Sequence, residues 1–414
     1  MNIAIIGSGI SGLVCTHLLA PDHQVTLFEA NDYLGGHTAT KTVELQGRKW
    51  SIDTGFIVFN DRTYPHFQKL INHLGVPYQP AEMSFSVSNE NTGLVYNGHS
   101  LSTLFAQKRN WFNPRFYSLL SEILRFNKRC KHYAATDIPD ITVGEFLKQQ
   151  GLSRYFAENY ILPMGAAIWS ASLGELEGFP LRFFIQFFNN HGLLNVNDRP
   201  QWYTITGGSK TYIPYLLKDR VLTIHLSTPI QSIQRTEQGV QVSSKQGVET
   251  FDEVILACHS DQALSLLTDA NPVELQVLGA IPYRLNDVVL HHDERLLPAI
   301  KKARASWNYH LSGAKDKPAL VTYSMNILQD LPLNSPEFCV TLNHSERINP
   351  AKILGQYAYS HPVYSQKMVA AQGRRTEICG QQHTHFCGAY WYNGFHEDGV
   401  RSALDVCQRF GVSL

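Results

Sequence analysis

The 414-residue chain is 43% hydrophobic and 17% charged, a composition that supports a sizeable buried core and excludes an intrinsically disordered protein. Lys plus Arg and Asp plus Glu both number 35, and this balance argues against a nucleic-acid partner. The length suits two or three domains. Seven cysteines without a C-x-x-C pair exclude a zinc ribbon and favour reduced thiols, and hence a cytoplasmic protein.

The first thirty residues alternate strand, turn, helix and strand. No apolar run approaches the length of a bilayer span, and no Lys or Arg precedes Lys41 as it would in a secretory signal, so we expect neither. Residues 2–6 (NIAII) predict a parallel strand that is buried on both faces. The turn GSGISG and the helix-like LVCTHLL follow, and residues 24–30 (QVTLFEA) predict a second strand.

The glycine spacing in this turn is typical of a dinucleotide-binding site. Gly7 permits the tight turn, Gly9 lets a pyrophosphate approach the backbone, and Gly12 lets the helix pack closely on the strand. The helix N-terminus faces the phosphate charge. The alternative is a glycine-rich turn in an ordinary α/β domain, but the strand–turn–helix context favours nucleotide binding.

An acidic residue, Glu29, stands at the end of the second predicted strand. Its carboxylate can accept hydrogen bonds from both hydroxyls of an adenosine ribose. An acid at this place disfavours a 2′-phosphate, so we do not expect NADP. The dinucleotide site predicted for this part of the chain comprises Gly7, Gly9, Ile10, Ser11, Gly12, Glu29 and Ala30.

Two short motifs downstream distinguish FAD from NAD. Gly35-Gly36-His37 follows the second strand, and Asp53-Thr54-Gly55 follows a further short strand. With the N-terminal turn they resemble the extended fingerprint of the flavin amine oxidase, phytoene desaturase and protoporphyrinogen oxidase superfamily. The resemblance implies an FAD cofactor in a Rossmann-type α/β domain, with both motifs at the cofactor. His37 replaces the usual arginine, but Gly35 and Gly36 can still offer backbone N–H groups to a diphosphate.

A middle segment extends the resemblance. Residues 201–217 (QWYTITGGSKTYIPYLL) are similar to the G-G-x segment that returns the chain to the cofactor domain in this superfamily. Residues 227–260 then predict strand, turn, strand, turn and strand. The resemblance implies that Ile230 contacts the adenine through its backbone. The alternative is a meander inserted in an unrelated α/β protein.

The C-terminal region resembles the second flavin motif of the superfamily. A strand ending at Gly388 leads to an aromatic loop, and Gly399 opens a predicted helix from Val400. The resemblance implies that N–H groups at this helix N-terminus bind the pyrimidine end of the flavin. We expect Asp398 to be the N-cap rather than a ligand. Ala389 stands where many amine oxidases have an acid.

The chain also resembles a bacterial group of predicted NAD/FAD-binding, amine-oxidase-like proteins. The shared phrases are LPMGAAIWS, SWNYH, VTYSMNILQ, LNHSERINP and FHEDG. That group is often encoded beside relatives of cyclopropane-fatty-acid synthase, which implies a lipid substrate. The resemblance further implies an FAD-binding domain made of residues 1–75, 201–265 and 371–414, and an α+β substrate domain made of residues 76–200 and 266–370.

Five phenylalanines lie between residues 179 and 188. With Pro180 at the first helical position, Phe183, Phe184, Phe187 and Phe188 form one broad aromatic face of a predicted helix. The hypothesis that we favour for this face is ordinary core packing. The alternatives are an apolar substrate tunnel or a face that touches a membrane.

The sequence identifies catalytic candidates only weakly. The pairs His291-His292 and His383-Thr384-His385 lack an H-E-x-x-H pattern or a third ligand, so we expect no metal site. Amine oxidases commonly carry a lysine near the flavin in a phrase of the type N-K-V-V-L. Asp287 replaces that lysine here, which weakens the amine oxidase hypothesis. Our candidates for the flavin-facing wall are Trp391, His396 and Glu397.

Together these features predict an FAD-dependent oxidoreductase that removes hydride from a C–H bond of a hydrophobic substrate, by desaturation or isomerisation of a lipid acyl chain. The flavin can take the hydride itself, so no general base is required. Two alternatives stay open: a flavin amine oxidase that produces hydrogen peroxide, and a non-catalytic flavin-binding partner of a lipid-modifying enzyme. A peripheral contact with a membrane also stays open.

Overall fold

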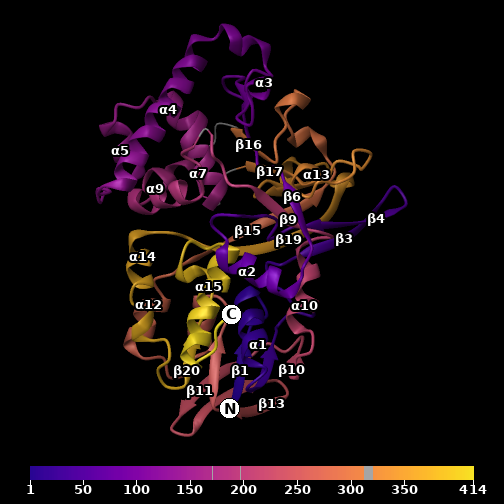
Figure 1. Ribbon diagram of the computed structural model, residues 1–414, viewed down its shortest axis with the longest axis vertical. Helices are drawn as coiled ribbons and strands as arrows, with labels where there is room; N and C mark the ends of the chain where they lie inside the picture. Colours follow the sequence, from indigo (N-terminus) through magenta and orange to yellow (C-terminus); the bar gives the residue numbers. More distant parts are fainter. Residues whose placement is uncertain (170, 196, 312–319) are drawn as a thin grey trace.

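The computed structural model describes residues 1–169, 171–195, 197–311 and 320–414. The phrase LPMGAAIWS therefore ends one residue outside the described part of the chain. The lower half of Figure 1 holds both chain termini and a parallel sheet, and the upper half is rich in helices. A mixed sheet lies between them.

The lower half is built on a five-stranded parallel sheet in the order β10-β2-β1-β14-β20. Its strands are β1 (Asn2–Ile6), β2 (Gln24–Phe28), β10 (Leu222–His225), β14 (Glu253–Leu256) and β20 (Thr384–Phe386). The central strand β1 is buried from Ile3 onward, which confirms the strand that the unbroken apolar run predicts. The sheet thus joins segments from the beginning, middle and end of the chain.

Two helices pack side by side with their N-termini at the carboxyl edge of this sheet: α1 (Ile10–Leu19) and α15 (His396–Arg409). A Cβ atom on Gly12 would overlap the Gly7 carbonyl oxygen, so only glycine lets α1 lie this close to the turn. A Cβ atom on Gly399 would lie 2.5 Å from Cγ2 of Ile10. The Ser11 hydroxyl donates to the Gly399 carbonyl at 2.9 Å. These glycines bring the two helix N-termini together.

Three smaller sheets surround this core. The antiparallel strands β11 (Ser232–Thr236), β12 (Gly239–Ser244) and β13 (Gly247–Phe251) confirm the meander predicted after residue 227. A hairpin is formed by β3 (Thr40–Leu45) and β4 (Arg48–Asp53). The third sheet pairs β9 (Trp202–Ile205) with β5 (Phe59–Asn60) and β6 (Tyr78–Ala81), and so connects segments of both halves.

A seven-stranded mixed sheet in the order β19-β15-β18-β17-β16-β7-β8 underlies the helices of the upper half. Its strands are β7 (Phe85–Asn89), β8 (Val95–Asn97), β15 (Tyr283–His291), β16 (Trp307–Leu311), β17 (Leu320–Ser324), β18 (Cys339–Leu342) and β19 (Ile353–Pro362). In the pairing of β15 with β19, Asn286 lies opposite Tyr359 and Arg284 opposite His361. This register decides which side chains face the carboxyl edge of the parallel sheet.

The upper half contains a group of helices between β8 and β9. They are α3 (Leu101–Leu104), the 3₁₀ helix η1 (Lys108–Phe112), α4 (Pro114–Ala135), α5 (Val143–Gln149), α6 (Arg154–Phe156), the π-helical turn η2 (Ala157–Ile161), α7 (Leu162–Trp169), α8 (Leu173–Glu177) and α9 (Leu181–Asn190). The remaining helices are α2 (Pro65–Leu74), α10 (Ile213–Leu217), α11 (Ser260–Leu266), α12 (Pro272–Leu278), α13 (Met325–Leu328) and α14 (Gln366–Gln372). Among the helices of the described residues, none combines the length and the apolar character that a bilayer span requires.

The phenylalanine-rich helix is α9, and its aromatic face is core. Pro180 is its N-cap, so the helix begins at Leu181, one residue later than we predicted. Phe184, Phe187 and Phe188 are buried, and Phe184 stacks on Phe188 with ring centroids 4.1 Å apart. Core packing, the hypothesis favoured from the sequence, therefore holds for these three rings, whereas Phe183 is half-buried and its ring lies 4.8 Å from that of Tyr364.

Candidate active site

The glycine-rich turn lies at the carboxyl edge of the parallel sheet, where open α/β sheets bind ligands. Gly7 has a φ angle of 102°, a backbone conformation that glycine adopts without strain. A Cβ atom on Gly9, the N-cap of α1, would meet nothing within 4 Å. A Cβ atom on Gly36 would lie 3.3 Å from the Cα atom of Gly9. Two side-chain-free segments thus meet beside a helix N-terminus, as a diphosphate requires.

Glu29 is buried just beyond β2 and organises this turn. One carboxylate oxygen accepts the N–H of Ser8 at 2.9 Å and its hydroxyl at 2.5 Å. The other oxygen accepts the N–H and the side-chain amide of Asn31 at 2.9 and 2.8 Å. The N–H of Thr228 donates to the Glu29 carbonyl at 2.9 Å, which brings the chain just before Ile230 to this place. The ribose contact of Glu29 and the adenine contact of Ile230 stay predictions.

Asp53 ties the end of β4 to the segment after β9. Its carboxylate accepts the Thr40 hydroxyl at 2.5 Å, and the N–H and the hydroxyl of Ser209 at 2.9 Å each. Burial raises the pKa of Asp53 to about 6. The carboxylate that we predicted at the cofactor therefore has protein donors of its own. Next to it, the Thr54 hydroxyl lies 2.8 Å from the Tyr359 hydroxyl.

Two glycines of the predicted cofactor site allow close approaches of the backbone. A Cβ atom on Gly55 would overlap the carbonyl oxygen of His37, so the D-x-G motif lies directly against the G-G-H motif. Gly388 follows β20, and a Cβ atom there would overlap the Tyr390 ring. The Gly388 N–H donates to the Ser402 hydroxyl of α15 at 2.8 Å.

The helix of the second flavin motif begins earlier than the sequence predicts. α15 starts at His396 and not at Val400, because the Asp398 carboxylate accepts the N–H of Phe395 at 2.9 Å and stabilises the first turn. Asp398 is therefore the third residue of the helix. Our prediction that Asp398 is the N-cap is wrong. Burial raises the pKa of Asp398 to about 7.

Among the three catalytic candidates, Glu397 caps the start of α2. Its carboxylate accepts the N–H groups of His66 and Phe67 at 3.0 and 2.8 Å, in the first turn of α2. An acid at this position satisfies helix N–H groups that otherwise lack partners. Both carboxylate oxygens of Glu397 therefore have protein donors, and its place in the flavin-facing wall stays a prediction. Trp391 is buried, with the Arg375 guanidinium 5.3 Å from its ring centroid.

His396, the third candidate, lies at the start of α15 within a buried polar network. Its ring stacks on Phe56 with centroids 3.7 Å apart, and its Nε2 atom lies 2.8 Å from the Tyr212 hydroxyl. The Tyr212 hydroxyl in turn lies 2.6 Å from the Thr38 hydroxyl. Burial lowers the pKa of His396 to about 3, so the ring is neutral at physiological pH.

Three further histidines from separate segments meet near the same edge of the sheet. The His37 ring centroid lies 5.3 Å from that of His361 and 6.3 Å from that of His259. Burial lowers the pKa of all three, to about 3 for His37 and about 4 for His361. The Nε2 atom of His37 is buried and has no partner among the described residues. The cluster is polar but uncharged, and it leaves one nitrogen for a ligand.

Asn286, rather than Asp287, faces this histidine cluster. Successive residues of β15 point to opposite faces of the sheet, and the side-chain amide of Asn286 lies 2.8 Å from Nδ1 of His361. The argument against amine oxidation depended on Asp287 in place of the family's lysine. Asp287 does not face the histidine cluster, so that argument does not apply to this wall of the site. The side chain there is a neutral amide.

The hydrogen bonds of Asn286 determine the tautomer of His361. The backbone N–H of Asp287 donates to the side chain of Asn343 at 3.2 Å, which identifies the accepting atom as Oδ1 and the other end of this amide as its NH₂ group. That group donates to Oδ1 of Asn286 at 2.9 Å, and the NH₂ group of Asn286 consequently donates to Nδ1 of His361. Neutral His361 therefore carries its proton on Nε2.

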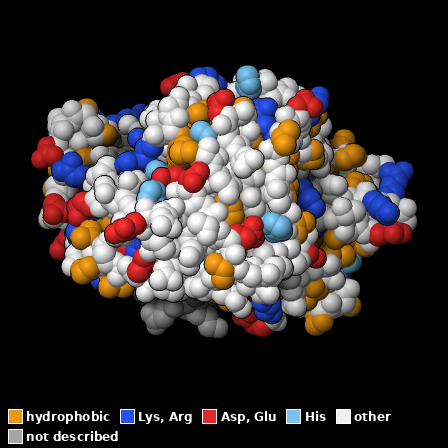
Figure 2. Space-filling model, turned by 90° about the horizontal axis from the view of Figure 1, so that it is seen from below, with side chains coloured by type: hydrophobic (Ala, Val, Ile, Leu, Met, Phe, Trp, Pro, Cys, Tyr) orange, Lys and Arg blue, Asp and Glu red, His pale blue; other side chains and the backbone are white. Residues whose placement is uncertain are grey.

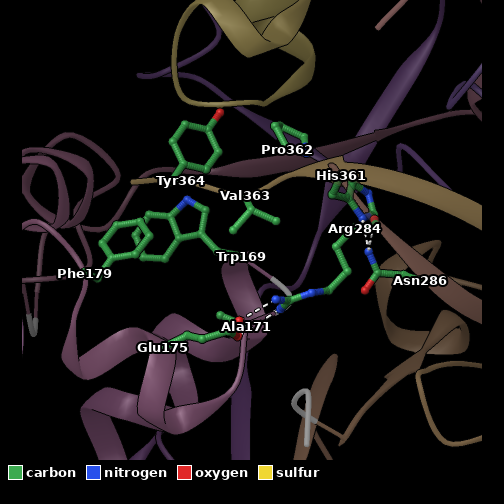
Figure 3. A pocket seen from close by; sticks show the side chains of 10 residues that line it. All are labelled: Trp169, Ala171, Glu175, Phe179, Arg284, Asn286, His361, Pro362, Val363 and Tyr364. Atoms are coloured by element: carbon green, nitrogen blue, oxygen red, sulfur yellow. Dashed lines mark hydrogen bonds and ion pairs between the residues drawn. The ribbon is translucent and has the colours of Figure 1, made fainter. Parts of the chain in front are cut away.

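A small pocket opens between the helices of the upper half and the strands β15 and β19 (Figure 3). Apolar and aromatic residues form one wall, and an ion pair forms the other. The pocket is lined by Trp169, Ala171, Glu175, Phe179, Arg284, Asn286, His361, Pro362, Val363 and Tyr364. His361 and Asn286 thus belong both to the histidine cluster and to the pocket.

The two walls of the pocket differ in chemistry. The Trp169 and Phe179 rings lie 4.6 Å apart, and the indole N–H of Trp169 is buried without a partner among the described residues. Opposite them, both nitrogens of the Arg284 fork bond to the two oxygens of Glu175. This pairing lowers the pKa of Glu175 to about 2. The pocket therefore contains a compensated ion pair beside an aromatic surface.

The fold and the site define a class: a two-domain oxidoreductase with the amine oxidase-like FAD-binding fold. The family model of flavin-containing amine oxidoreductases matches residues 10–295. The chain belongs to this family. An L-amino-acid oxidase from Siganus canaliculatus is 25% identical over 290 residues, which are 64% of this chain and 50% of that protein. The chain thus spans about half the length of this curated relative.

Three solved structures share the fold over 99% of this chain. A putative protoporphyrinogen oxidase from Exiguobacterium sp. 255-15 has a TM-score of 0.69 at 17% identity, and 98% of it is covered. A fatty acid isomerase from P. acnes that produces CLA has a TM-score of 0.68 at 16% identity, with 98% covered. Cyclohexylamine oxidase from Brevibacterium oxydans IH-35A has a TM-score of 0.67 at 16% identity, with 99% covered. The family match confirms the predicted superfamily, the FAD cofactor and, at the level of the family, an FAD-dependent oxidoreductase. The solved structures confirm the predicted fold class.

The residues present fit FAD. The backbone of Gly9 and Gly36 and the N-terminus of α1 would hold the diphosphate, and the N-terminus of α15 would face the flavin pyrimidine. Buried polar atoms that lack a partner among the described residues include those of His37, which follows β2, and of Tyr390 and Trp391, which follow β20. Such atoms are costly unless a ligand satisfies them. We found no group of three metal-ligating side chains in the described residues.

The sequence analysis missed the polar residues of the pocket and of the histidine cluster, although Phe179 belongs to the phenylalanine-rich segment that it singled out. His259 lies three residues after the end of β14, and its place beyond the carboxyl end of a parallel strand could have indicated it. His361, Asn286 and Arg284 lie on antiparallel strands that are far apart in the chain, where no local pattern marks them.

Proposed function

We propose that this protein removes hydride from a C–H bond of a hydrophobic, fatty-acyl-like substrate whose polar end is a hydrogen-bond acceptor. The observation that carries the proposal is the pocket of Figure 3, which combines an aromatic wall with N–H donors. FAD, when bound, accepts the hydride in such a reaction. The chain binds and orients the substrate.

The apolar wall is suited to a hydrocarbon chain. The Trp169 and Phe179 rings are tilted by 30° with centroids 4.6 Å apart, and the Tyr364 ring lies 4.8 Å from that of Phe183. Pro362 and Val363 continue this surface. Each methylene that such a wall removes from water contributes about 0.8 kcal/mol to binding, so a long acyl chain gains affinity without any charge.

The polar groups of the pocket favour an acceptor over an ammonium group. His361 carries its proton on Nε2, and the Trp169 indole N–H lacks a partner among the described residues. Glu175 is the only carboxylate among the ten lining residues, and Arg284 already pairs with both of its oxygens. A substrate carboxylate or carbonyl would satisfy the free donors, whereas an ammonium group would place its own donors against them.

The neutral histidines have a further role in this proposal. His37, His259 and His361 keep the wall of the site polar without a fixed charge. Because Nδ1 of His361 accepts the Asn286 amide, this ring acts as a hydrogen-bond donor and not as a base. It would hold the acceptor end of the substrate while the flavin takes the hydride. Similarity in fold does not choose between substrates, because the solved relatives include both a fatty acid isomerase and an amine oxidase.

An anaerobic titration of the FAD-loaded protein with oleate and with oleylamine tests the proposal, because these probes share one chain length and differ in the head group. We expect oleate to perturb the flavin spectrum at lower concentration than oleylamine. We expect Asn286→Asp to reduce this preference about tenfold, or about 1.4 kcal/mol. The new carboxylate would accept a hydrogen bond from a proton on Nδ1 of His361, and Nε2 of His361 would then carry the lone pair. Arg154→Met is the matched control, because Arg154 pairs with Glu177 outside the pocket.

Other outcomes would contradict the proposal in distinguishable ways. Rapid bleaching by oleylamine with release of hydrogen peroxide on aeration would establish the amine oxidase instead. Equal affinities for both probes would disprove the donor role of His361 and leave the apolar wall intact. A protein that holds FAD but is neither reduced nor spectrally perturbed by either probe would support the non-catalytic flavin-binding partner.

A further inference from the structure

The outer end of the upper half carries large apolar side chains on its surface. It is formed by α3, η1 and the first turns of α4, at the top of Figure 1, and we call residues 101–117 the tip. Four of its side chains are exposed: Leu101 at 78%, Trp111 at 54%, Phe112 at 88% and Tyr117 at 46%. Isolated exposed hydrophobic residues are common, but four within seventeen residues mark an interaction surface.

These side chains rest on an ordered base. The Trp111 ring stacks on Phe105 with centroids 4.0 Å apart, and Phe105 lies edge-on to the buried ring of Phe116 at 5.6 Å. The Tyr117 hydroxyl donates to the carbonyl of Trp111 at 3.0 Å. The aromatic residues are thus held outward by their own packing, and a partner would gain their apolar area without first reorganising the tip.

The tip itself carries only basic charge, and Glu82 lies beside His99 just before it. Residues 91–121 contain Lys108, Arg109 and Arg115 and no Asp or Glu. All three cations are exposed. The short helix η5 (Lys301–Ala303), which packs against α3 and β8, adds the exposed Lys301 and Lys302. By contrast, the opposite face of the molecule, seen in Figure 2, shows acidic and basic side chains interspersed.

We infer that the tip is a docking surface for an anionic lipid membrane. Trp, Tyr, Phe and Leu beside a rim of Lys and Arg match the boundary between lipid head groups and acyl chains. Anionic lipids attract the basic rim, and the apolar side chains then enter the boundary. A second copy of this chain would bring two basic rims together and is disfavoured. The inference depends on exposure and charge at the tip and not on the proposed function of the pocket.

Vesicle binding tests this inference on the full-length, FAD-loaded protein. We expect cosedimentation with vesicles of phosphatidylglycerol and phosphatidylcholine, weaker binding at higher salt, and little binding to phosphatidylcholine alone. The variant Trp111→Ser/Phe112→Ser should bind at least tenfold more weakly. Lys108→Glu/Arg115→Glu should weaken binding to the anionic vesicles by about fivefold or more for each charge that is removed.

Matched controls separate docking from damage to the fold. Val221→Ser/Leu333→Ser removes two apolar side chains of 89% and 108% exposure elsewhere on the surface and should bind like the parent protein. FAD content and the unfolding temperature should be the same in all variants. Quenching by brominated lipids should be smaller in Trp111→Phe than in the parent.

Three results would overturn the inference. The first is the absence of binding to anionic vesicles, and the second is unchanged binding by both tip variants. The third is a dimer in sedimentation velocity that dissociates in Trp111→Ser/Phe112→Ser, because the tip would then bind a second copy of the chain.

Discussion

Replacement of Glu29 by alanine should weaken FAD binding through the turn that this side chain supports. The carboxylate accepts both the N–H and the hydroxyl of Ser8, which is fully buried. In Glu29→Ala these two donors lose their acceptor in a place that water does not reach. Asn31, which donates to the other oxygen, is exposed, so water can replace that half of the carboxylate.

The magnitude follows from the buried half of this network. Each unsatisfied buried donor costs about 1–3 kcal/mol, so the two donors of Ser8 set a loss of about 2–6 kcal/mol. A loss of about 3 kcal/mol corresponds to a dissociation constant for FAD that is higher by roughly two orders of magnitude. Glu29→Gln keeps an uncharged acceptor toward Ser8 and should lose about half as much.

Titration of the apoprotein with FAD measures the loss of binding free energy. Thermal unfolding of the apoprotein measures how far the substitution destabilises the fold without the cofactor. Glu249→Ala on β13 is the matched control, because its side chain is exposed on a strand of the separate three-stranded sheet. If Glu29 acts through Ser8, the effects of Glu29→Ala and Ser8→Ala will not add in a double-mutant cycle. Unchanged FAD affinity in Glu29→Ala would refute the reasoning, and full additivity would assign the effect to the ribose alone.

Four other outcomes are expected. Acid precipitation should release FAD intact, because no cysteine or histidine lies in a recognised attachment motif; flavin left in the pellet would indicate a covalent link, for which Cys387 is the nearest candidate by sequence. Anaerobic NADH or NADPH should reduce the flavin slowly, since the 414 residues contain one G-x-G-x-x-G; rapid bleaching at micromolar concentration would recast the protein as a reductase. Gly399→Ala should lower the unfolding temperature and FAD affinity at a cost of about 1–3 kcal/mol, because the new Cβ would lie 2.5 Å from Cγ2 of Ile10; an unchanged melting curve would contradict the close approach of α1 and α15. The protein should lose stability as the pH falls below 6.5, because burial lowers the pKa of His291 to about 4. At pH 5 this residue alone should lower the free energy of unfolding by about 2 kcal/mol relative to neutral pH, and His291→Gln should flatten the profile of unfolding temperature against pH.

The N-terminal part of the cofactor site could be predicted from the sequence because its geometry is local. The positions of Gly7, Gly9 and Gly12 are determined by a tight turn, a close approach and the packing of one helix on the strand that precedes it. All three constraints act within a dozen residues, and the structure confirms the overlap that a side chain on Gly12 would cause. The meander after residue 227 was predictable for the same reason, since hairpin turns carry their own residue signature.

Two details of the C-terminal helix could not be predicted from the sequence. The carboxylate of Glu397 caps α2, whose first turn is about 330 residues away in the sequence, so no local pattern indicates this contact. The start of α15 shifted to His396 because the Asp398 carboxylate captures the Phe395 N–H, a bond that spacing alone did not distinguish from an N-cap.

Tertiary structure alone decided the wall of the pocket. His37, His259, Asn286 and His361 come from four separate segments and meet only because β14, β15 and β19 bring them to one edge. The orientation of Asn286 depends on strand register: a slip of one residue in β15 would turn it to the other face and present Asp287 instead. Local backbone geometry is encoded in short residue patterns, whereas the convergence of side chains depends on pairing between distant strands, which no short pattern contains.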